Sequence, residues 1–79
     1  MGYTMRDRLQ KIFSDSLSIP LELVVDNLKY SECPDWDSVA HMGLVAAIEE
    51  AFDIMIDAED VIDMSSFLKA QHILAKYLG

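Results

Sequence analysis

The chain has 79 residues and a net charge of −8, from 6 Lys and Arg against 14 Asp and Glu. A chain this short is expected to form one domain, residues 1–79, with a small core. The negative charge excludes nucleic acid and anionic membrane surfaces as partners, because both attract cations. Cys33 is the single cysteine, so no internal disulfide can form, which suits a reducing compartment. We therefore expect a cytoplasmic monomer.

Apolar residues recur at helical spacing through most of the chain. The spacing predicts main helices over about 4–17, 38–52 and 66–78, and a short helical turn over 58–63. These helices are expected to begin at Thr4, at Asp37 or Ser38, after a cap at Asp57, and after Ser65 or Ser66. The fold class is therefore all-α: a small four-helix bundle of three main helices plus one short helix.

A long loop, residues 18–37, separates the first two helices. Pro20 and Pro34 interrupt it, and the apolar periodicity fades. A loop of this length is uncommon unless it has a function or packs on the core. Trp36 is expected to close its end. The other residues expected to fix the loop to the core are Leu21, Leu23, Val24, Val25 and Leu28.

The second helix has two different faces when its residues are placed 100° apart. The expected core face holds Leu44, Ile48, Ala51 and Phe52, with His41 and Val45 at its edge. The opposite side holds Ser38, Val39, Met42, Ala46, Glu49, Glu50 and Asp53. An exposed strip that mixes apolar and acidic side chains is suited to docking, since apolar residues supply contact area and charges set orientation.

Acidic residues are concentrated in the middle of the chain. No Lys or Arg lies between Lys29 and Lys69. The acids of this window are Glu32, Asp35, Asp37, Glu49, Glu50, Asp53, Asp57, Glu59, Asp60 and Asp63. Such a field attracts partners with basic docking patches. On charge alone, an ordinary solvated acidic face explains the pattern equally well.

The segment 35–52 resembles the acyl carrier protein family. Members have Asp-Ser-Leu at the start of the second helix, and here Asp37-Ser38-Val39 occupies that place. Glu49, Glu50 and Phe52 match the end of the family's helix. The connector, the short acidic helix and the closing amphipathic helix also follow the family layout. The resemblance covers nearly the whole chain.

The resemblance implies a covalent cofactor on Ser38. A phosphopantetheinyl transferase would attach 4′-phosphopantetheine from coenzyme A to this serine, and the arm's thiol would hold an acyl group as a thioester. Asp37 would orient the helix start and contribute to transferase recognition. A phosphodiester also suits a helix N-terminus, where free amides and the dipole favour an anion.

The implied partners are acyl-loading and acyl-using enzymes with basic docking patches, in fatty acid, polyketide or another specialised biosynthesis. The residues expected to dock them are Val39, Met42, Glu49, Glu50 and Asp53. The tripeptide Trp36-Asp37-Ser38 is more similar to free-standing carriers of specialised pathways than to the housekeeping carrier.

The chain departs from the family at three positions. Val39 replaces Leu, Gly43 stands where many members carry an acid, and Asp53 stands where Gly often closes the helix. Two other functions remain open. One is an amino-acid or aryl carrier loaded by an adenylating enzyme, and the other is an unmodified acidic helical interaction domain.

No enzyme active site is predicted. His41 follows Ser38 closely, but no acid at a fitting spacing completes a catalytic triad, so a structural histidine is favoured. A metal site is not predicted either. The acids from Asp53 to Asp63 lack the glycine that a calcium-binding EF-hand loop needs.

Overall fold

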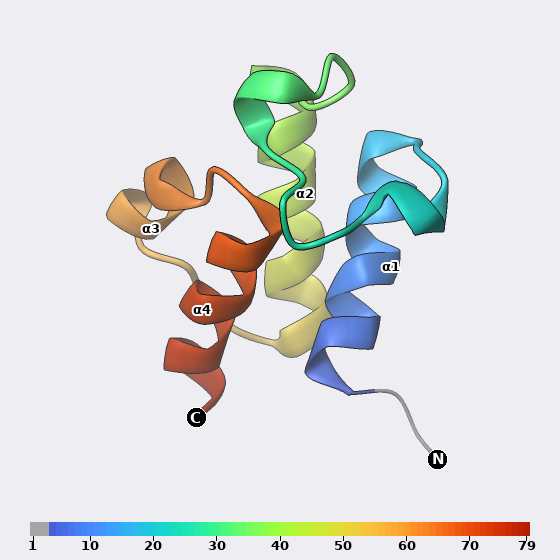
Figure 1. The fold of residues 1–79 in the computed structure, drawn as a ribbon. Helices are drawn as coiled ribbons and strands as arrows, with labels where there is room; N and C mark the ends of the chain where they lie inside the picture. Colours follow the sequence, from blue (N-terminus) through green and yellow to red (C-terminus); the bar gives the residue numbers. More distant parts are fainter. Residues whose placement is uncertain (1–3) are drawn as a thin grey trace.

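A computed structural model describes residues 4–79, and within this range the only regular elements are helices. The elements are α1 (Met5–Leu17), α2 (Ser38–Phe52), α3 (Ala58–Asp63) and α4 (Phe67–Leu78), with short 3-10 turns at Leu21–Leu23 and Tyr30–Glu32 (Figure 1). The expected all-α bundle of three main helices and one short helix is confirmed. No helix within residues 4–79 is long and apolar enough to cross a membrane.

Polar side chains begin the three main helices. Thr4 forms a capping box with Asp7, in which each side chain accepts the other's backbone N–H. Asp37 Oδ1 accepts the Ala40 N–H at 2.8 Å, and the Ser66 hydroxyl caps α4 in the same way. These local bonds satisfy amides that a helix start leaves free, so the helix starts follow from sequence.

Asp57 does not cap α3 through its side chain, contrary to expectation. The Asp57 backbone begins the helix instead, because its carbonyl accepts the N–H groups of Asp60 and Val61. Its own N–H donates to the Tyr77 hydroxyl at 2.9 Å. The start of α3 is therefore fixed to α4 by a side chain distant in sequence.

The core centres on Phe13 of α1. Its ring meets the edges of Trp36 and Phe67 at centroid distances of 5.2 and 5.0 Å. Trp36 is 1% exposed, which confirms that it closes the end of the long loop. One aromatic cluster therefore joins α1, the loop and α4. The other fully buried large side chains are Leu9, Leu44, Ile48, Met64, Leu74 and Val24.

Most of the apolar residues expected to fix the loop are exposed. Only Val24 is fully buried, and Leu28 is half-buried. The exposed ones are Leu21, Leu23 and Val25. A three-residue 3-10 turn can direct few side chains inward, and here Gln10 holds the turn by donating to the carbonyls of Leu21 and Val24. Ile19, which is buried, supplies the missing anchor.

The core face of α2 is rotated slightly from the expected one. Val45 is buried, whereas Ala51 is exposed, so the expectation for Ala51 was wrong. The buried residues of α2 are Leu44, Val45 and Ile48, so the core face is centred closer to Val45 and Ala51 lies at its edge, in the last turn of the helix. Arg8 donates to the Ala51 carbonyl at 2.7 Å and its guanidinium lies 4.3 Å from the centre of the Phe52 ring. The last turn of α2 thus contacts a polar side chain, and Phe52 is half-buried.

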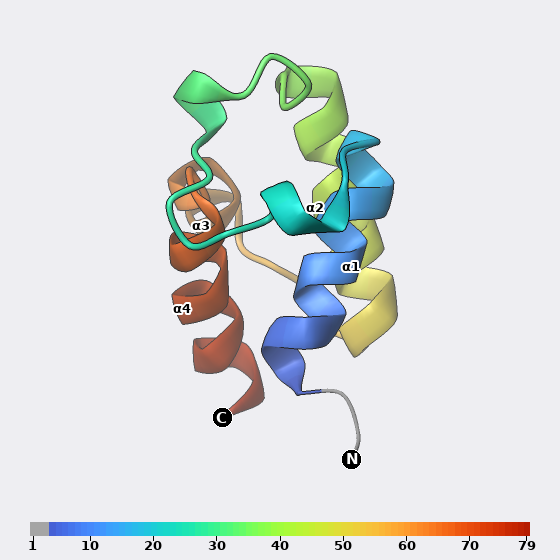
Figure 2. The same ribbon diagram turned by 45° about the vertical axis from the view of Figure 1, so that its right-hand side comes forward.

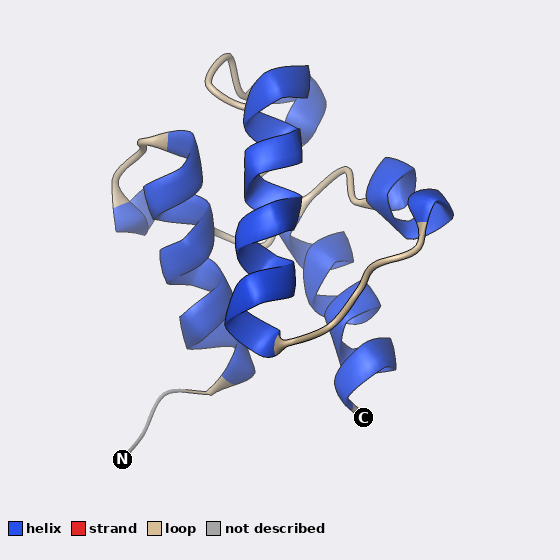
Figure 3. Ribbon diagram, turned by 180° about the vertical axis from the view of Figure 1, so that it is seen from behind, coloured by secondary structure: helices blue, strands red, loops and turns tan. Residues whose placement is uncertain are grey.

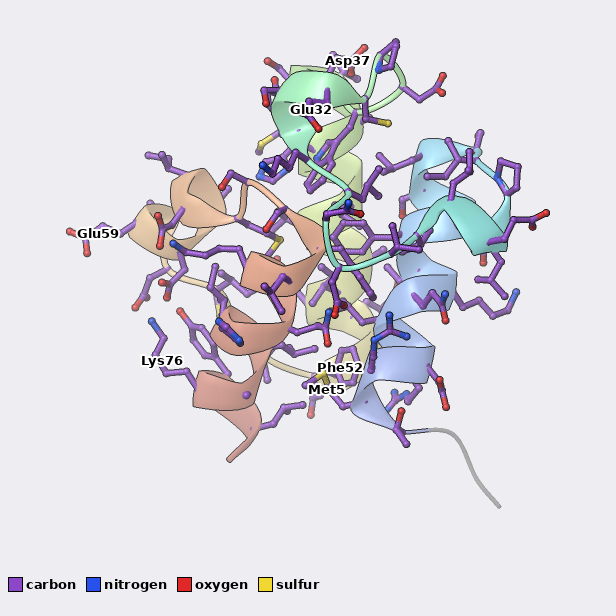
Figure 4. The ribbon with its side chains drawn as sticks, in the orientation of Figure 1. Met5, Glu32, Asp37, Phe52, Glu59 and Lys76 are labelled. Atoms are coloured by element: carbon purple, nitrogen blue, oxygen red, sulfur yellow. The ribbon has the colours of Figure 1, made fainter. Side chains whose placement is uncertain are left out.

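The arrangement of helices gives the molecule two distinct ends. The start of α1 and the end of α4 lie at one end, and the start of α2 lies at the other (Figures 1 and 2). Figure 4 shows Met5 and Phe52 together at the first end and Asp37 at the second. Viewed from behind, α2 lies between α1 and α4, and no other element covers its outer side (Figure 3).

Candidate functional site

Ser38 is the first residue of α2 and is exposed. The preceding Asp37 accepts the Ala40 N–H with its side chain and the His41 N–H with its carbonyl, at 2.8 Å each. The amides of Ser38 and Val39 have no intrahelical acceptor at a helix start. The serine hydroxyl therefore lies at the positive end of the α2 dipole, beside free donors.

The Ser38 hydroxyl contacts one side chain from the long loop. Its Oγ lies 3.3 Å from the Tyr30 hydroxyl, a distance at which either oxygen can donate. The Tyr30 N–H donates to the Ser65 carbonyl at 2.9 Å, next to a bridge between Lys29 and Ser66. The loop is thus fastened to the start of α4 where Tyr30 reaches the serine.

His41 lies one turn after Ser38, and both of its ring nitrogens are hydrogen-bonded. Its Nδ1 accepts the Trp36 indole N–H at 2.9 Å. Its Nε2 therefore carries the proton and donates to the Val61 carbonyl at 2.8 Å. The imidazole connects the loop, α2 and α3, and neither nitrogen is free to accept a proton from Ser38.

An open pocket of about 310 Å³ lies beside Ser38, between α2 and α3. Its walls are formed by Tyr30, Ser38, His41, Met42, Val61, Ile62, Met64 and Ser65. Large apolar side chains surround the serine: Val39 is 82% exposed, Met42 64% and Ile62 83%. Exposed apolar side chains next to a polar site are typical of a surface that binds a partner.

The sequence-predicted docking residues fall into two groups. Val39 and Met42 lie in the first turns of α2, close to Ser38. Glu49, Glu50 and Asp53 lie at its far end, about 10 to 20 Å further along the helix axis at 1.5 Å per residue. The structure therefore does not bring all five together.

The two glutamates at the end of α2 differ. Glu49 is half-buried, and its Oε2 accepts the Ile56 N–H at 2.9 Å, which holds the connector against the helix. Glu50 is exposed. Asp53 is exposed too, and it ends the helix in the left-handed conformation, with φ of 56°. Glu50 and Asp53 form no ion pair within residues 4–79.

The acids of α3 have mixed environments. The Tyr77 hydroxyl donates to Asp60 at 2.6 Å, and this bond is the largest cause that lowers the Asp60 pKa; Lys76, at 2.9 Å, adds to it. The same bond with Asp60 raises the pKa of Tyr77. Glu59, by contrast, projects away from the outer end of α3 (Figure 4). Asp63 pairs with Lys69 at 3.5 Å, so Glu59 is the one acid of α3 without an ion pair within residues 4–79.

Sequence reasoning missed the residues that face Ser38 from other elements. These are Tyr30, Val61, Ile62, Met64 and Ser65. Val61 and Ile62 carried a signal, as apolar residues in a short acidic helix. Tyr30 lies in a non-periodic loop, and only the path of that loop places it at the serine.

The site is thus an exposed serine at a helix start, beside an open pocket and one turn before a histidine whose two ring nitrogens are both hydrogen-bonded. No known family model matches the sequence. A curated relative, the acyl carrier protein of Buchnera aphidicola subsp. Schizaphis graminum (strain Sg), is 33% identical over 63 residues, which are 80% of each chain. The chain belongs to the acyl carrier protein family.

Proposed function

We propose that this protein holds an acyl intermediate as a thioester on a 4′-phosphopantetheine arm attached to Ser38, and presents it to enzymes of fatty acid, polyketide or another specialised biosynthesis. The observation that carries the proposal is the place of Ser38, exposed as the first residue of α2 in a member of this family. The protein would act as a cytoplasmic monomer, with residues 1–79 as one carrier domain.

The surroundings of Ser38 fit the arm. The phosphodiester would lie at a helix N-terminus, where the free amides of Ser38 and Val39 and the dipole favour an anion. When bound, the arm supplies a thiol on a long flexible chain. The protein's own thiol cannot replace it, because Cys33 is half-buried in the loop. The residues of the bundle position the arm and recognise partners.

The recognition surface would combine apolar contacts near Ser38 with acidic charge. Val39, Met42 and Ile62 offer exposed apolar area to the transferase and to acyl-handling enzymes. Asp37 fixes the helix start that the transferase must recognise. Glu50 and Asp53, with Glu59 of α3, would attract basic docking patches and set the orientation of approach.

The proposal is tested by intact mass spectrometry after incubation with coenzyme A and a broad-specificity phosphopantetheinyl transferase. We expect the wild type to gain one phosphopantetheinyl group and Ser38→Ala to gain none. Ser65→Ala is the matched control, because Ser65 is an exposed hydroxyl on the same pocket. It should be modified like the wild type.

The outcomes separate the open alternatives. A folded wild type that gains no mass would contradict the proposal and favour an unmodified acidic interaction domain. A modified protein that is loaded only by an adenylating enzyme with an amino acid or aryl acid would keep the arm and change the cargo. Loading with acyl groups, released by hydroxylamine, would support the thioester carrier.

A further inference from the structure

The Tyr30 hydroxyl is the one side-chain group within residues 4–79 that is hydrogen-bonded to Ser38. Its ring packs on one side against two neighbours, with its centroid 5.7 Å from that of Trp36 and 5.9 Å from that of His41, both at steep interplanar angles. Both neighbours are fixed in turn, since the Trp36 indole donates to His41. The Tyr30 backbone is bonded to Ser65. The hydroxyl is therefore preorganised at the serine.

Attachment of the arm changes the chemistry of this contact. An O–P bond replaces the O–H bond of Ser38, the nucleotide half of coenzyme A leaves, and the hydroxyl proton departs to the transferase or solvent. The ester oxygen then has no hydrogen. Of the two oxygens 3.3 Å apart, only that of Tyr30 can still donate.

A hydrogen-bond donor beside Ser38 would stabilise the negative charge that the arm brings to an acidic part of the chain. A phosphodiester adds a negative charge at a site flanked by Asp35 and Asp37, and no Lys or Arg lies in the sequence between Lys29 and Lys69. The Asp37 carboxylate already accepts the Ala40 amide. Neutral donors next to a charged oxygen form stronger hydrogen bonds than they do with a neutral acceptor.

We propose that Tyr30 is a positioning residue for the attached arm: its hydroxyl donates to the phosphodiester on Ser38 and holds the base of the arm beside the Tyr30 and His41 side chains that line the pocket. This inference rests on the proposed function, because it requires the arm on Ser38. It assigns to the long loop a direct role at the attachment site.

The test compares three holo proteins by phosphorus NMR: wild type, Tyr30→Phe and Tyr77→Phe. Tyr30→Phe keeps the ring and removes only the hydroxyl. Tyr77→Phe is the matched control, because its hydroxyl contacts Asp57 and Asp60 rather than Ser38. Intact mass first establishes complete modification. The phosphorus resonance of the folded wild type should differ from that in urea, and Tyr30→Phe should lose most of that difference while Tyr77→Phe retains it.

A folded, fully modified Tyr30→Phe protein with the wild-type phosphorus resonance would overturn the inference and leave the proposed function intact. Absence of the mass gain in the wild type would overturn both. If Tyr30→Phe does not fold, the inference is tested on the wild-type holo protein by nuclear Overhauser spectroscopy. Nuclear Overhauser contacts between the Tyr30 ring and the first methylene of the arm support the inference, and their absence from a fully assigned spectrum overturns it.

Discussion

Asp53 occupies a backbone conformation that favours glycine. Its φ of 56° and ψ of 51° are left-handed, and it follows the last turn of α2. This conformation costs a residue with a Cβ about 1–2 kcal/mol, somewhat less for Asp. Its negative charge also lies at the negative end of the helix dipole. The residue therefore lowers stability in two ways.

We expect Asp53→Gly to raise the free energy of unfolding by about 1 kcal/mol, measured by urea denaturation. Asp53→Asn should give a smaller gain, since it removes the charge and keeps the Cβ. Ser18→Gly is an independent comparison, because Ser18 ends α1 with the same φ of 56° and carries no charge. A loss of stability in Asp53→Gly would show that its carboxylate makes a stabilising contact.

His41 is the residue that most directly couples separate parts of the site. We expect His41→Phe to lower the free energy of unfolding by about 2 kcal/mol, because it leaves the buried Trp36 indole N–H and the Val61 carbonyl without partners. His41→Gln can accept at one atom and donate at another, and should recover part of the loss. Equal stability of His41→Phe and wild type in urea would refute this structural role.

At the scale of elements, α3 differs from the other helices because it buries no residue. Half-buried Val61 packs against the core, and polar contacts hold the rest of the helix. His41 of α2 binds the Val61 carbonyl, while Tyr77 and Lys76 of α4 bind Asp60. Local opening therefore costs less here than in the core helices. This helix forms one wall of the pocket beside Ser38.

The Asp60 contacts give α3 a dependence on acid. The hydrogen bonds from Tyr77 and Lys76 lower the Asp60 pKa in the folded protein below its usual 3.8. These bonds therefore stabilise the folded state fully above pH 3.8, and this stabilisation is lost as the pH falls through the Asp60 pKa of the folded protein. We expect Tyr77→Phe to unfold more easily at neutral pH, and to lose less additional stability than the wild type on acidification.

The measurement is urea denaturation at neutral pH and at a series of pH values running well below 3.8. Hydrogen exchange of the α3 amides should be faster in Tyr77→Phe at neutral pH. Tyr30→Phe is the control, because its hydroxyl contacts Ser38 rather than Asp60. An identical acid dependence in wild type and Tyr77→Phe would contradict this account of how α3 is held.

At the scale of the whole molecule, negative charge and apolar area share the outer side of α2 and α3. Electrostatic attraction speeds encounter, and it weakens with salt because the screening length falls to about 3 Å at 1 M. We expect Glu50→Lys to lower the transferase kcat/KM several-fold at low salt, with the difference shrinking at high salt.

Glu22→Lys provides the matched control for Glu50→Lys. It makes the same change of net charge in the exposed turn Leu21–Leu23, away from α2 and α3. Its kcat/KM should stay closer to that of the wild type. Glu49 is unsuitable for this test, because its carboxylate also holds the Ile56 amide. Equal losses in both variants would indicate a response to net charge alone, without a localised docking surface.

Features of the fold that depend on hydrogen bonds between residues close in sequence could be predicted from the sequence. Thr4, Asp37 and Ser66 cap their own helices, so the helix starts could be found from neighbouring residues. The burial of Trp36 was also predictable, since a large ring at the end of an apolar loop has few alternatives. The place of Ser38 follows from the Asp37 cap.

The features that were missed depend on contacts between distant segments. Tyr30 reaches Ser38 because its N–H is bonded to Ser65. Ala51 is exposed in a last turn whose carbonyl binds Arg8 of another helix. Glu49 folds back onto Ile56 across the connector. An ideal helical wheel contains none of these interactions.

The most direct test of the account is to locate the modification by fragment mass spectrometry, on protein isolated from cells that contain a phosphopantetheinyl transferase. The account predicts a phosphopantetheinyl group on Ser38 alone, and none at other serines. The arm on another residue, such as Ser31 or Ser65, or no arm on a folded protein in such cells, would contradict the claim that the start of α2 is the attachment site.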